Sequence, residues 1–369
     1  MVQAVKTITS NEGVRHLDEL LAQRHLVVWL GSGISVWAPS NLPNGQKVTS
    51  DLAAVIAAQA ETPTEIVCQL IKQTAFEHIM ERYPRREALT EIFARAYYPT
   101  APNAVHEAFA HLINQGVIDA VVTTNYDAGL EAACAAICAP ARQPLVIVEP
   151  DDAPVGLVPP ARPVILKIHG CASPARRHTM VITLSEEGEL EDWKRRWLQA
   201  LITGRHLLVS GYSGLDFDLC AEMALLRPDA LSWNSFGNPL EQPGALTDNA
   251  QRVIKAHEGT VLVGDMKEML TRLTGQPCLA EWGEPVSFVD ELVRELNGDE
   301  LLDQWRSGLF NGLGCALAAL AVARRLPEKY PVTTSANLDG TRGSAVPPRA
   351  LFPVQQQLSR RSTARTTIK

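Results

Sequence analysis

The sequence lacks the paired cysteines of a zinc-binding protein. Its seven cysteines are scattered over 369 residues, and no two of them form a Cys-x-x-Cys pair. Structural zinc sites commonly use two such pairs. We therefore expect no zinc or other metal site, and we expect most of the cysteines to be buried free thiols.

Long apolar segments and an excess of positive charge are also absent. No apolar run approaches the roughly 20 residues that a membrane helix needs. Residues 1–6 do not have the apolar core of a secretion signal. The sequence thus predicts a cytoplasmic protein with no membrane contact. The formal net charge of -7 argues against direct nucleic-acid binding.

Two common nucleotide-binding fingerprints are missing as well. A glycine turn, Gly-Ser-Gly-Ile-Ser at residues 31–35, follows an apolar run at residues 26–30. Val36 stands where the fingerprint G-x-G-x-x-G needs its third glycine, and no Gly-Lys-Ser/Thr follows to make a P-loop. Taken alone, the turn is compatible with a nucleotide site or with an ordinary tight turn.

What the sequence does contain is a series of strand-like apolar runs. Most are continuous rather than alternating, which is typical of a parallel sheet covered on both faces. We predict strands at residues 26–30, 118–123, 144–149, 163–168, 206–211, 230–234 and 260–264. Helical patterns occur at residues 11–23, 104–114, 189–203 and 266–273. The predicted fold is α/β, a Rossmann-like parallel sheet with helices on both faces.

Three further segments surround this predicted sheet. Residues 51–98 are interpreted as a small helical module inserted after the first strand, within a domain that spans residues 1–275. Residues 276–330 form a short all-helical region, with helices at 286–296 and 299–326. Because stable helical arrays usually need about three repeats, we expect residues 277–326 to mediate a homo-oligomer or a partner contact. Residues 331–369 are predicted to be a disordered tail.

Four polar motifs each follow one of the predicted strands. In an open parallel sheet, residues just past the carboxyl ends of the strands line one crevice, where ligands bind. We therefore expect the four motifs to meet around a single ligand. They are the glycine turn at 31–35, Thr-Thr-Asn-Tyr-Asp at 123–127, Lys-Ile-His-Gly at 167–170 and Gly-Tyr-Ser at 211–213.

Each motif has a chemical and a purely structural interpretation. Asn125 and Asp127 can hold a sugar hydroxyl, a water or a carboxamide, or they can form an Asx turn that caps the helix starting near residue 128. His169 can act as a general base with an ordinary pKa of about 6.5, or it can be a hydrogen-bonded strand-end histidine. Ser213 and Asp216 can bind ribose or phosphate, or they can form a turn before a helix.

Taken in order, these motifs resemble the NAD-binding domain of the sirtuin family over about residues 10–275. The resemblance also includes Pro102-Asn103 with His106, and Gly264-Asp265 after the last strand. It is closer to the bacterial sirtuin-like branch than to the protein deacylases. The four-cysteine zinc module of the deacylases is missing, and so is their Asp-Phe-Arg segment after the glycine turn.

The resemblance implies a role for individual residues. It places the nicotinamide ribose near three catalytic residues, Asn125, Asp127 and His169. The pyrophosphate lies near the glycine turn, and the adenosine half lies near residues 211–213 and 264–265. The implied NAD-binding residues are Gly31, Ser32, Gly33, Ser35, Thr124, Gly211, Ser213, Asp216, Gly264 and Asp265.

The activity implied by the resemblance is hydrolysis of NAD+, as the substrate, to nicotinamide and ADP-ribose in bacterial antiphage defence. The pyridinium is already a cationic leaving group, so the site needs no general acid. It must stabilise an oxocarbenium-like state and deliver water. Two alternatives stay open: an NAD-dependent protein deacylase or ADP-ribosyltransferase, and a sensor that binds NAD or ADP-ribose without chemistry.

Overall fold

The computed structural model describes residues 6–8, 15–16, 18–19, 22, 26–59, 80, 86–154, 156, 161–188, 190–242 and 244–283. The helices predicted at 286–296 and 299–326, the 276–330 region from residue 284 onward, and the 331–369 tail lie outside these residues. Residues 60–79 and 81–85 of the predicted helical module lie outside them too.

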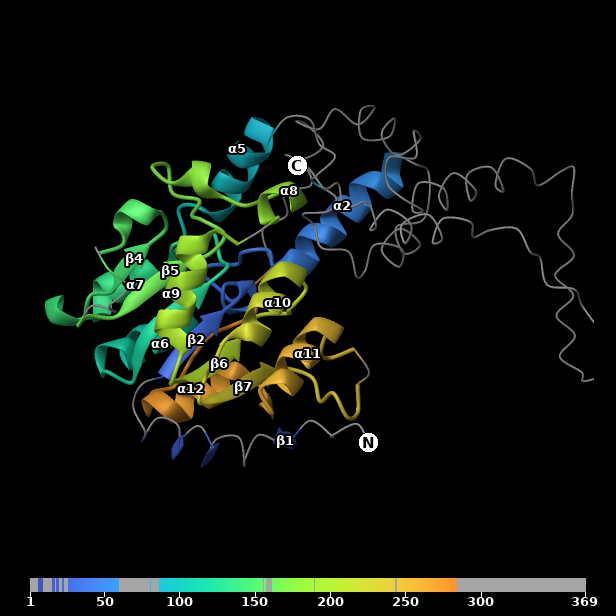
Figure 1. Ribbon diagram of the computed structural model, residues 1–369. Coiled ribbons are helices and arrows are strands. Elements are labelled where there is room, and N and C mark those ends of the chain that lie inside the picture. The colour runs from blue at the N-terminus through green and yellow to red at the C-terminus, as the bar shows by residue number, and fades with distance from the viewer. Residues whose placement is uncertain are drawn as a thin grey trace, which may run out of the picture. The chain divides into compact units, whose positions relative to one another are not determined.

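The described residues form an eight-stranded sheet in which every neighbouring pair of strands is parallel (Figure 1). The strand order is β1-β8-β7-β6-β2-β3-β5-β4. All the predicted strands are confirmed within one or two residues, and β1 is an edge strand that the sequence pattern did not reveal. The strands are β1 (Lys6–Ile8), β2 (Leu26–Leu30), β3 (Ile118–Thr123), β4 (Leu145–Ile147), β5 (Val164–Lys167), β6 (His206–Ser210), β7 (Ala230–Ser235) and β8 (Thr260–Val263).

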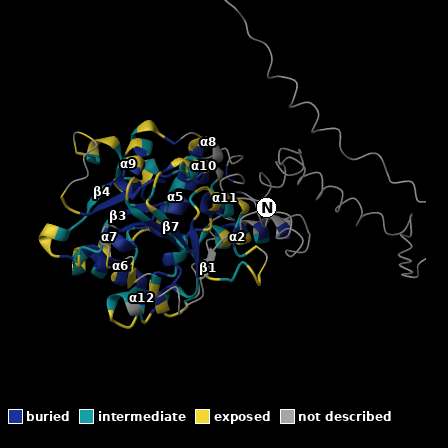
Figure 2. Cartoon of the chain, turned by 60° about the horizontal axis from the view of Figure 1, so that its bottom comes forward, coloured by how far each residue is buried: buried dark blue, intermediate teal, exposed yellow. Residues whose placement is uncertain are grey.

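Helices cover both faces of the sheet, which explains why its strands are apolar throughout. In β2, Val28 and Leu30 pack into one buried cluster, whereas Val27 and Trp29 pack into the other. The first cluster includes residues of α6 (Ala104–Asn114), α7 (Gly129–Ile137) and α12 (Met266–Thr274). The second includes residues of α9 (Asp192–Ile202), α10 (Phe217–Leu225) and α11 (Asp248–Ala256). Figure 2 shows the buried sheet between partly exposed helices.

The remaining helices lie in the connections. The helical module predicted at residues 51–98 overlaps α2 (Gly45–Gln59) and includes α5 (Arg86–Tyr97). The helix α2 begins before the predicted start of the module. The predicted helix 189–203 corresponds to α9, preceded by the short α8 (Leu184–Glu187). The described residues also form short 3-10 turns: η1 (Ser32–Ile34), η2 (Pro140–Arg142), η3 (Pro150–Asp152) and η4 (Arg177–Thr179).

Within the part of the chain that the structure describes, no helix combines the length and the apolar character needed to span a membrane. The described cysteines are free thiols: Cys134, Cys138, Cys171 and Cys220 are buried, and Cys278 is half-buried. The prediction of buried free thiols is therefore confirmed for the first four. The same described residues contain no group of three or more His, Cys, Asp or Glu placed to hold a metal ion.

Candidate functional site

The four polar motifs begin at the same level, because the strands before them end in register. Leu30 pairs with Thr123 on one side and with Ser210 on the other, and Thr123 pairs with Lys167. The strands β6, β2, β3 and β5 are neighbours, and the chain order reverses between β2 and β6. Such a reversal is the topological switch point at which open α/β sheets bind ligands.

The glycine turn after β2 packs directly on the turn after β6. The Gly31 amide donates to the Ser210 carbonyl at 3.1 Å, and the Gly33 amide donates to the Gly211 carbonyl at 2.9 Å. A Cβ added to Gly31 would lie 2.5 Å from the Gly211 oxygen, and one added to Gly33 would lie 2.9 Å from the Gly211 Cα. Glycine is therefore required here by loop-on-loop contact, and contact with a phosphate stays a prediction.

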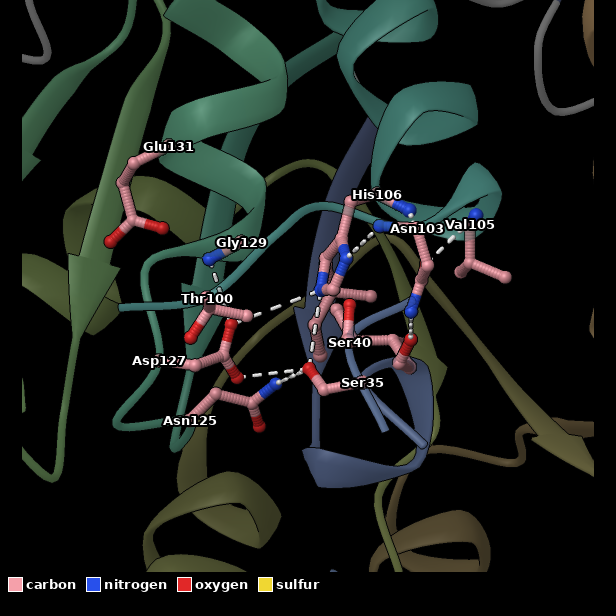
Figure 3. A network of polar contacts seen from close by, with 12 residues as sticks. Ser35, Ser40, Thr100, Asn103, Val105, His106, Asn125, Asp127, Gly129 and Glu131 are labelled. Carbon is pink, nitrogen blue, oxygen red and sulfur yellow. Dashed lines mark hydrogen bonds and ion pairs between the residues drawn. The ribbon is translucent and has the colours of Figure 1, made fainter. Parts of the chain in front are cut away.

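Ser35 lies at the centre of a buried hydrogen-bond network (Figure 3). Its Oγ is 3.1 Å from His106 Nε2 and 3.3 Å from Asn125 Nδ2, and it donates to Asp127 Oδ2 at 2.9 Å. The loop after β2, the helix α6 and the loop after β3 therefore meet at a single hydroxyl group.

The tautomer of His106 follows from its partners. The backbone amide of Asn103 donates to His106 Nδ1 at 3.1 Å, so Nδ1 is an acceptor and the proton of the neutral ring is on Nε2. His106 therefore donates to Ser35, and Ser35 donates to Asp127. Burial lowers the pKa of His106, although the Asp127 and Glu131 carboxylates oppose this effect. A neutral ring is consistent with that direction.

Asp127 forms the Asx turn considered from the sequence and also joins the Ser35 network, whereas contact with a ligand stays a prediction. Its Oδ1 accepts from the Gly129 amide at 2.8 Å, which is the local hydrogen bond of an Asx turn at the start of α7. Its Oδ2 accepts from Ser35 and faces the network. The turn thus holds the carboxylate in a fixed orientation, and Asp127 is only 4% exposed.

Asn125 has an unsatisfied polar atom in this network. Its Nδ2 donates to Ser35, but its buried Oδ1 has no hydrogen-bond partner among the described residues. Leaving a buried acceptor unpaired costs about 1–3 kcal/mol. Such an atom is explained if a ligand or a water supplies the missing donor.

A small cavity of about 200 Å³, counting the space that opens to solvent, lies beside these groups. The space enclosed within it is only about that of one water molecule, well below the roughly 300–1,000 Å³ of typical small-molecule sites. Its lining is apolar on part of its surface and charged or polar on the rest. The lining residues are Leu30, Ile34, His106, Thr123, Asn125, Asp127, Leu130, Glu131 and Lys167.

His169 lies next to the Asn125 loop but does not line this cavity. The Ile168 amide donates to the Thr123 carbonyl, and the Ala172 amide donates to the Tyr126 carbonyl, each at 2.8 Å, so the two loops run side by side. His169 is 5% exposed, and its carbonyl accepts from the Val181 amide at 3.1 Å. The backbone at His169 is thereby fixed on both sides.

The other predicted NAD-binding residues are spread along the same edge of the sheet. Ser32, Gly33 and Thr124 are half-buried in the loops after β2 and β3, and Ser213 is exposed after β6. Asp216 immediately precedes α10. Gly264 donates its amide to the Ser235 carbonyl, and Asp265 accepts from the Lys267 amide as the cap of α12. None of these residues lines the small cavity.

Four polar residues of the cavity were given no role by sequence reasoning: His106, Thr123, Glu131 and Lys167. A signal for Lys167 was present, because a lysine ends a strand that is otherwise entirely apolar. Glu131 follows Asp127 by four residues and lies in the first turn of α7. Their pairing depends on how α7 packs against β5, which the sequence pattern does not contain.

Comparison with known proteins finds that part of the chain is similar to a described family. A family model described as a SIR2-like domain matches residues 119–227, which contain Asn125, Asp127, His169 and Gly211. The matched segment is thus similar to a SIR2-like domain. A search of curated proteins gave no match.

Similar solved structures are Sir2 enzymes, at low identity. One, from work on the mechanism and regulation of Sir2 enzymes, is 14% identical with a TM-score of 0.35, covering 72% of this chain and 100% of that one. Sir2Tm bound to a propionylated peptide is 14% identical with a TM-score of 0.38, covering 77% and 98%. A Sir2 histidine-to-alanine mutant with a deacetylated p53 peptide and 3'-O-acetyl ADP ribose is 16% identical with a TM-score of 0.41, covering 71% and 97%.

Proposed function

We propose that this chain hydrolyses the bond between nicotinamide and ribose in NAD+, giving nicotinamide and ADP-ribose. The observation that carries the proposal is the buried, unpaired Oδ1 of Asn125 beside the fixed carboxylate of Asp127. Both face a small cavity at the carboxyl ends of the strands. The SIR2-like match over residues 119–227 supports NAD as the substrate.

The proposed reaction uses three side chains of this edge. Asn125 Oδ1 accepts from a ribose hydroxyl or from the attacking water, and Asp127 accepts from the carboxamide of nicotinamide. The glycosidic bond breaks, and its electron pair goes to the pyridinium nitrogen, which leaves as neutral nicotinamide. The oxygen of water bonds to the ribose carbon, and His169 takes the proton that this water loses.

The wider role of the proposed activity rests on the resemblance to bacterial sirtuin-like proteins. We propose that NAD+ hydrolysis serves antiphage defence and that the enzyme is latent in the cell until triggered, because continuous loss of NAD+ would be toxic. We expect the purified protein to keep a measurable basal rate. Residues 277–326, the predicted site of oligomer or partner contact, lie beyond the described residues from 284 onward.

Release of nicotinamide from NAD+ by the purified protein, with no peptide present, tests the proposal. Asn125→Ala should lower the rate by about 100-fold, the usual effect of losing one group that stabilises a developing charge, and His169→Ala should also abolish release. Asn114→Ala is the matched control, because Asn114 Oδ1 accepts from the Ala139 amide at the opposite end of α6. This control should keep the wild-type rate.

Other outcomes would support the alternatives instead. Release that occurs only with an acyl-lysine peptide would indicate a deacylase, and release only with a protein acceptor would indicate an ADP-ribosyltransferase. NAD+ binding that survives His169→Ala, without release under any of these conditions, would indicate a sensor.

A further inference from the structure

Lys167 is a charged residue in a fully buried position. It is the last residue of β5, and its exposure is 0%. Taking an ammonium ion out of water costs several kcal/mol, even after the protein relaxes. The contacts of Lys167 must therefore compensate for this cost, and they show what the residue holds in place.

The Lys167 ammonium has two acceptors in the segment that follows the neighbouring strand β3. Its Nζ donates to the main-chain carbonyl of Asp127 and, at 2.8 Å, to Glu131 Oε1. Burial alone would lower the pKa of Lys167, but the surrounding acids, with Glu131 the strongest, raise it above the usual value. The side chain is therefore charged at neutral pH.

These contacts fix the turn that carries the proposed active-site side chains. The Asp127 carbonyl belongs to the turn that contains Asn125, and Glu131 lies in the first turn of α7, as Figure 3 shows. The side chains of Asn125 and Asp127 are held by Ser35, from the loop after β2. Lys167 holds the backbone of the same turn from β5, on the other side of β3.

A purely structural role predicts a different residue at this position. Replacing a buried ion pair with apolar side chains of similar volume is often neutral or stabilising. An apolar residue here would, however, leave the Asp127 carbonyl without its donor and the turn without its link to β5. The ammonium thus contributes more to the position of the Asp127 turn than to the stability of the fold.

We infer that Lys167 is a positioning residue that holds the Asn125–Asp127 turn in its reactive geometry through the Asp127 carbonyl. This inference rests on the proposed function. Lys167 also lines the cavity, together with Asn125 and Asp127. Removing the ammonium would therefore change the same part of the cavity lining that the turn forms.

Three variants separate positioning from stability. Lys167→Met removes the donor and leaves Glu131 as an uncompensated carboxylate. Lys167→Met combined with Glu131→Gln removes the donor without leaving that charge. Glu131→Gln alone keeps the Lys167 bond to the Asp127 carbonyl and is the matched control.

The measurements are the thermal midpoint, kcat and KM for nicotinamide release, and the Kd for NAD+ by calorimetry. Lys167→Met should lower kcat by at least about tenfold, because a 1 Å misplacement can cost about 100-fold, and should change KM less. The double variant should have a thermal midpoint at least as high as that of Glu131→Gln, in which the buried Lys167 ammonium loses its counterion, but it should have a lower kcat. Glu131→Gln should lower kcat less than either Lys167 variant, because it keeps the donor to the Asp127 carbonyl.

A double variant with the kcat of Glu131→Gln would overturn the inference, since the loss in Lys167→Met would then reflect only the unpaired charge. If Lys167→Met does not fold, the double variant alone decides.

If the wild type binds NAD+ but releases no nicotinamide, the proposed function fails, and the Kd for NAD+ decides about Lys167. Weaker NAD+ binding in both Lys167 variants than in Glu131→Gln supports positioning, and equal binding overturns it. A wild type that does not bind NAD+ overturns both.

Discussion

Ser35 Oγ uses its full hydrogen-bonding capacity on three side chains that come from distant parts of the chain. It accepts from His106 Nε2 and Asn125 Nδ2, and it donates to Asp127 Oδ2. The direction of each bond is fixed by the Asn103 amide, which occupies His106 Nδ1. One serine therefore orients both the amide and the carboxylate that face the cavity.

Gly170 should be the least replaceable glycine near His169. Its φ is +82°, and an added Cβ would lie 2.1 Å from the Thr179 carbonyl oxygen. Gly204 has a similar φ of +69°, but no atom lies within 4 Å of its Cβ position. Gly204→Ala should therefore cost only the left-handed backbone strain, roughly 1–2 kcal/mol, whereas Gly170→Ala should cost more and should displace His169.

Urea unfolding of the two variants checks this prediction, with nicotinamide release as the second measurement. Gly204→Ala should keep the wild-type rate, and Gly170→Ala should lose it. Equal losses of unfolding free energy in the two variants would contradict the role assigned to the Thr179 contact.

At the scale of single residues, the sequence predicted that Asn125 and Asp127 face one crevice, because their position past the end of a strand is a local property. It did not predict the pairing of Lys167 with Glu131, which are 36 residues apart in the chain. Nor did it show that His106 reaches Ser35 across 71 residues. Contacts of this kind depend on which helix packs on which strand.

The start of α6 is hydrogen-bonded to the segment of the glycine turn. The Asn103 Oδ1 accepts from the amides of Val105 and His106, and its Nδ2 donates to the carbonyls of Ile34 and Trp37. The same side chain therefore caps the helix and holds the segment on either side of Ser35. Helix capping and site geometry are coupled at Asn103.

Substitutions of Asn103 should separate these two effects. Asn103→Ala should lower the unfolding free energy by about 1–2 kcal/mol, the upper range for the loss of a cap. Asn103→Ser keeps a capping oxygen, so it should recover most of the stability. It has no amide to donate to Ile34 and Trp37. Both variants should release nicotinamide more slowly than the wild type.

Chemical denaturation and initial rates measured on the same preparations test this pair. A serine variant with both wild-type stability and a wild-type rate would show that the bonds to Ile34 and Trp37 do not affect the site.

Element boundaries were predictable where their signals are local. The bounds of α6 agree with the prediction because Asn103 caps the helix and Gly116 follows its end. The helix α2 begins earlier than the predicted start at residue 51, and the Asn44 Oδ1 accepts from the Lys47 amide at its first turn. The strand β1 depends on its pairing with β8 and has no apolar run of its own.

For the whole molecule, the buried His106 and the half-buried His206 predict a loss of stability in mild acid. Burial lowers the pKa of His206 to about 4 from an ordinary value of 6.5, and the nearby His16 adds to this shift. His206 Nε2 lies 2.9 Å from Ser232 Oγ, at the amino ends of β6 and β7. Burial lowers the pKa of His106 as well.

The sign of the effect follows from proton linkage. Below pH 6.5 the unfolded chain takes up protons at these histidines while the folded chain does not, so the unfolding free energy falls as the pH falls. For His206 the loss accumulates between pH 6.5 and about 4, below which both states are protonated. Each such proton changes the unfolding free energy by about 1.4 kcal/mol per pH unit.

Urea unfolding at pH 7 and at pH 5 measures this dependence directly. The wild type should lose more stability between the two values than His206→Gln, which cannot take up a proton at this position. An identical loss in the two proteins would show that His206 does not contribute.

The central claim is that water is the acceptor of the ADP-ribosyl group at the edge formed by Asn125, Asp127 and His169. The most direct measurement is the ratio of free nicotinamide to free ADP-ribose formed from NAD+ by the wild-type protein without peptide. Hydrolysis predicts equal amounts of the two products, and about 100-fold slower formation of both by Asn125→Ala. Nicotinamide in excess of free ADP-ribose, or no nicotinamide until an acyl-lysine peptide is added, would contradict it.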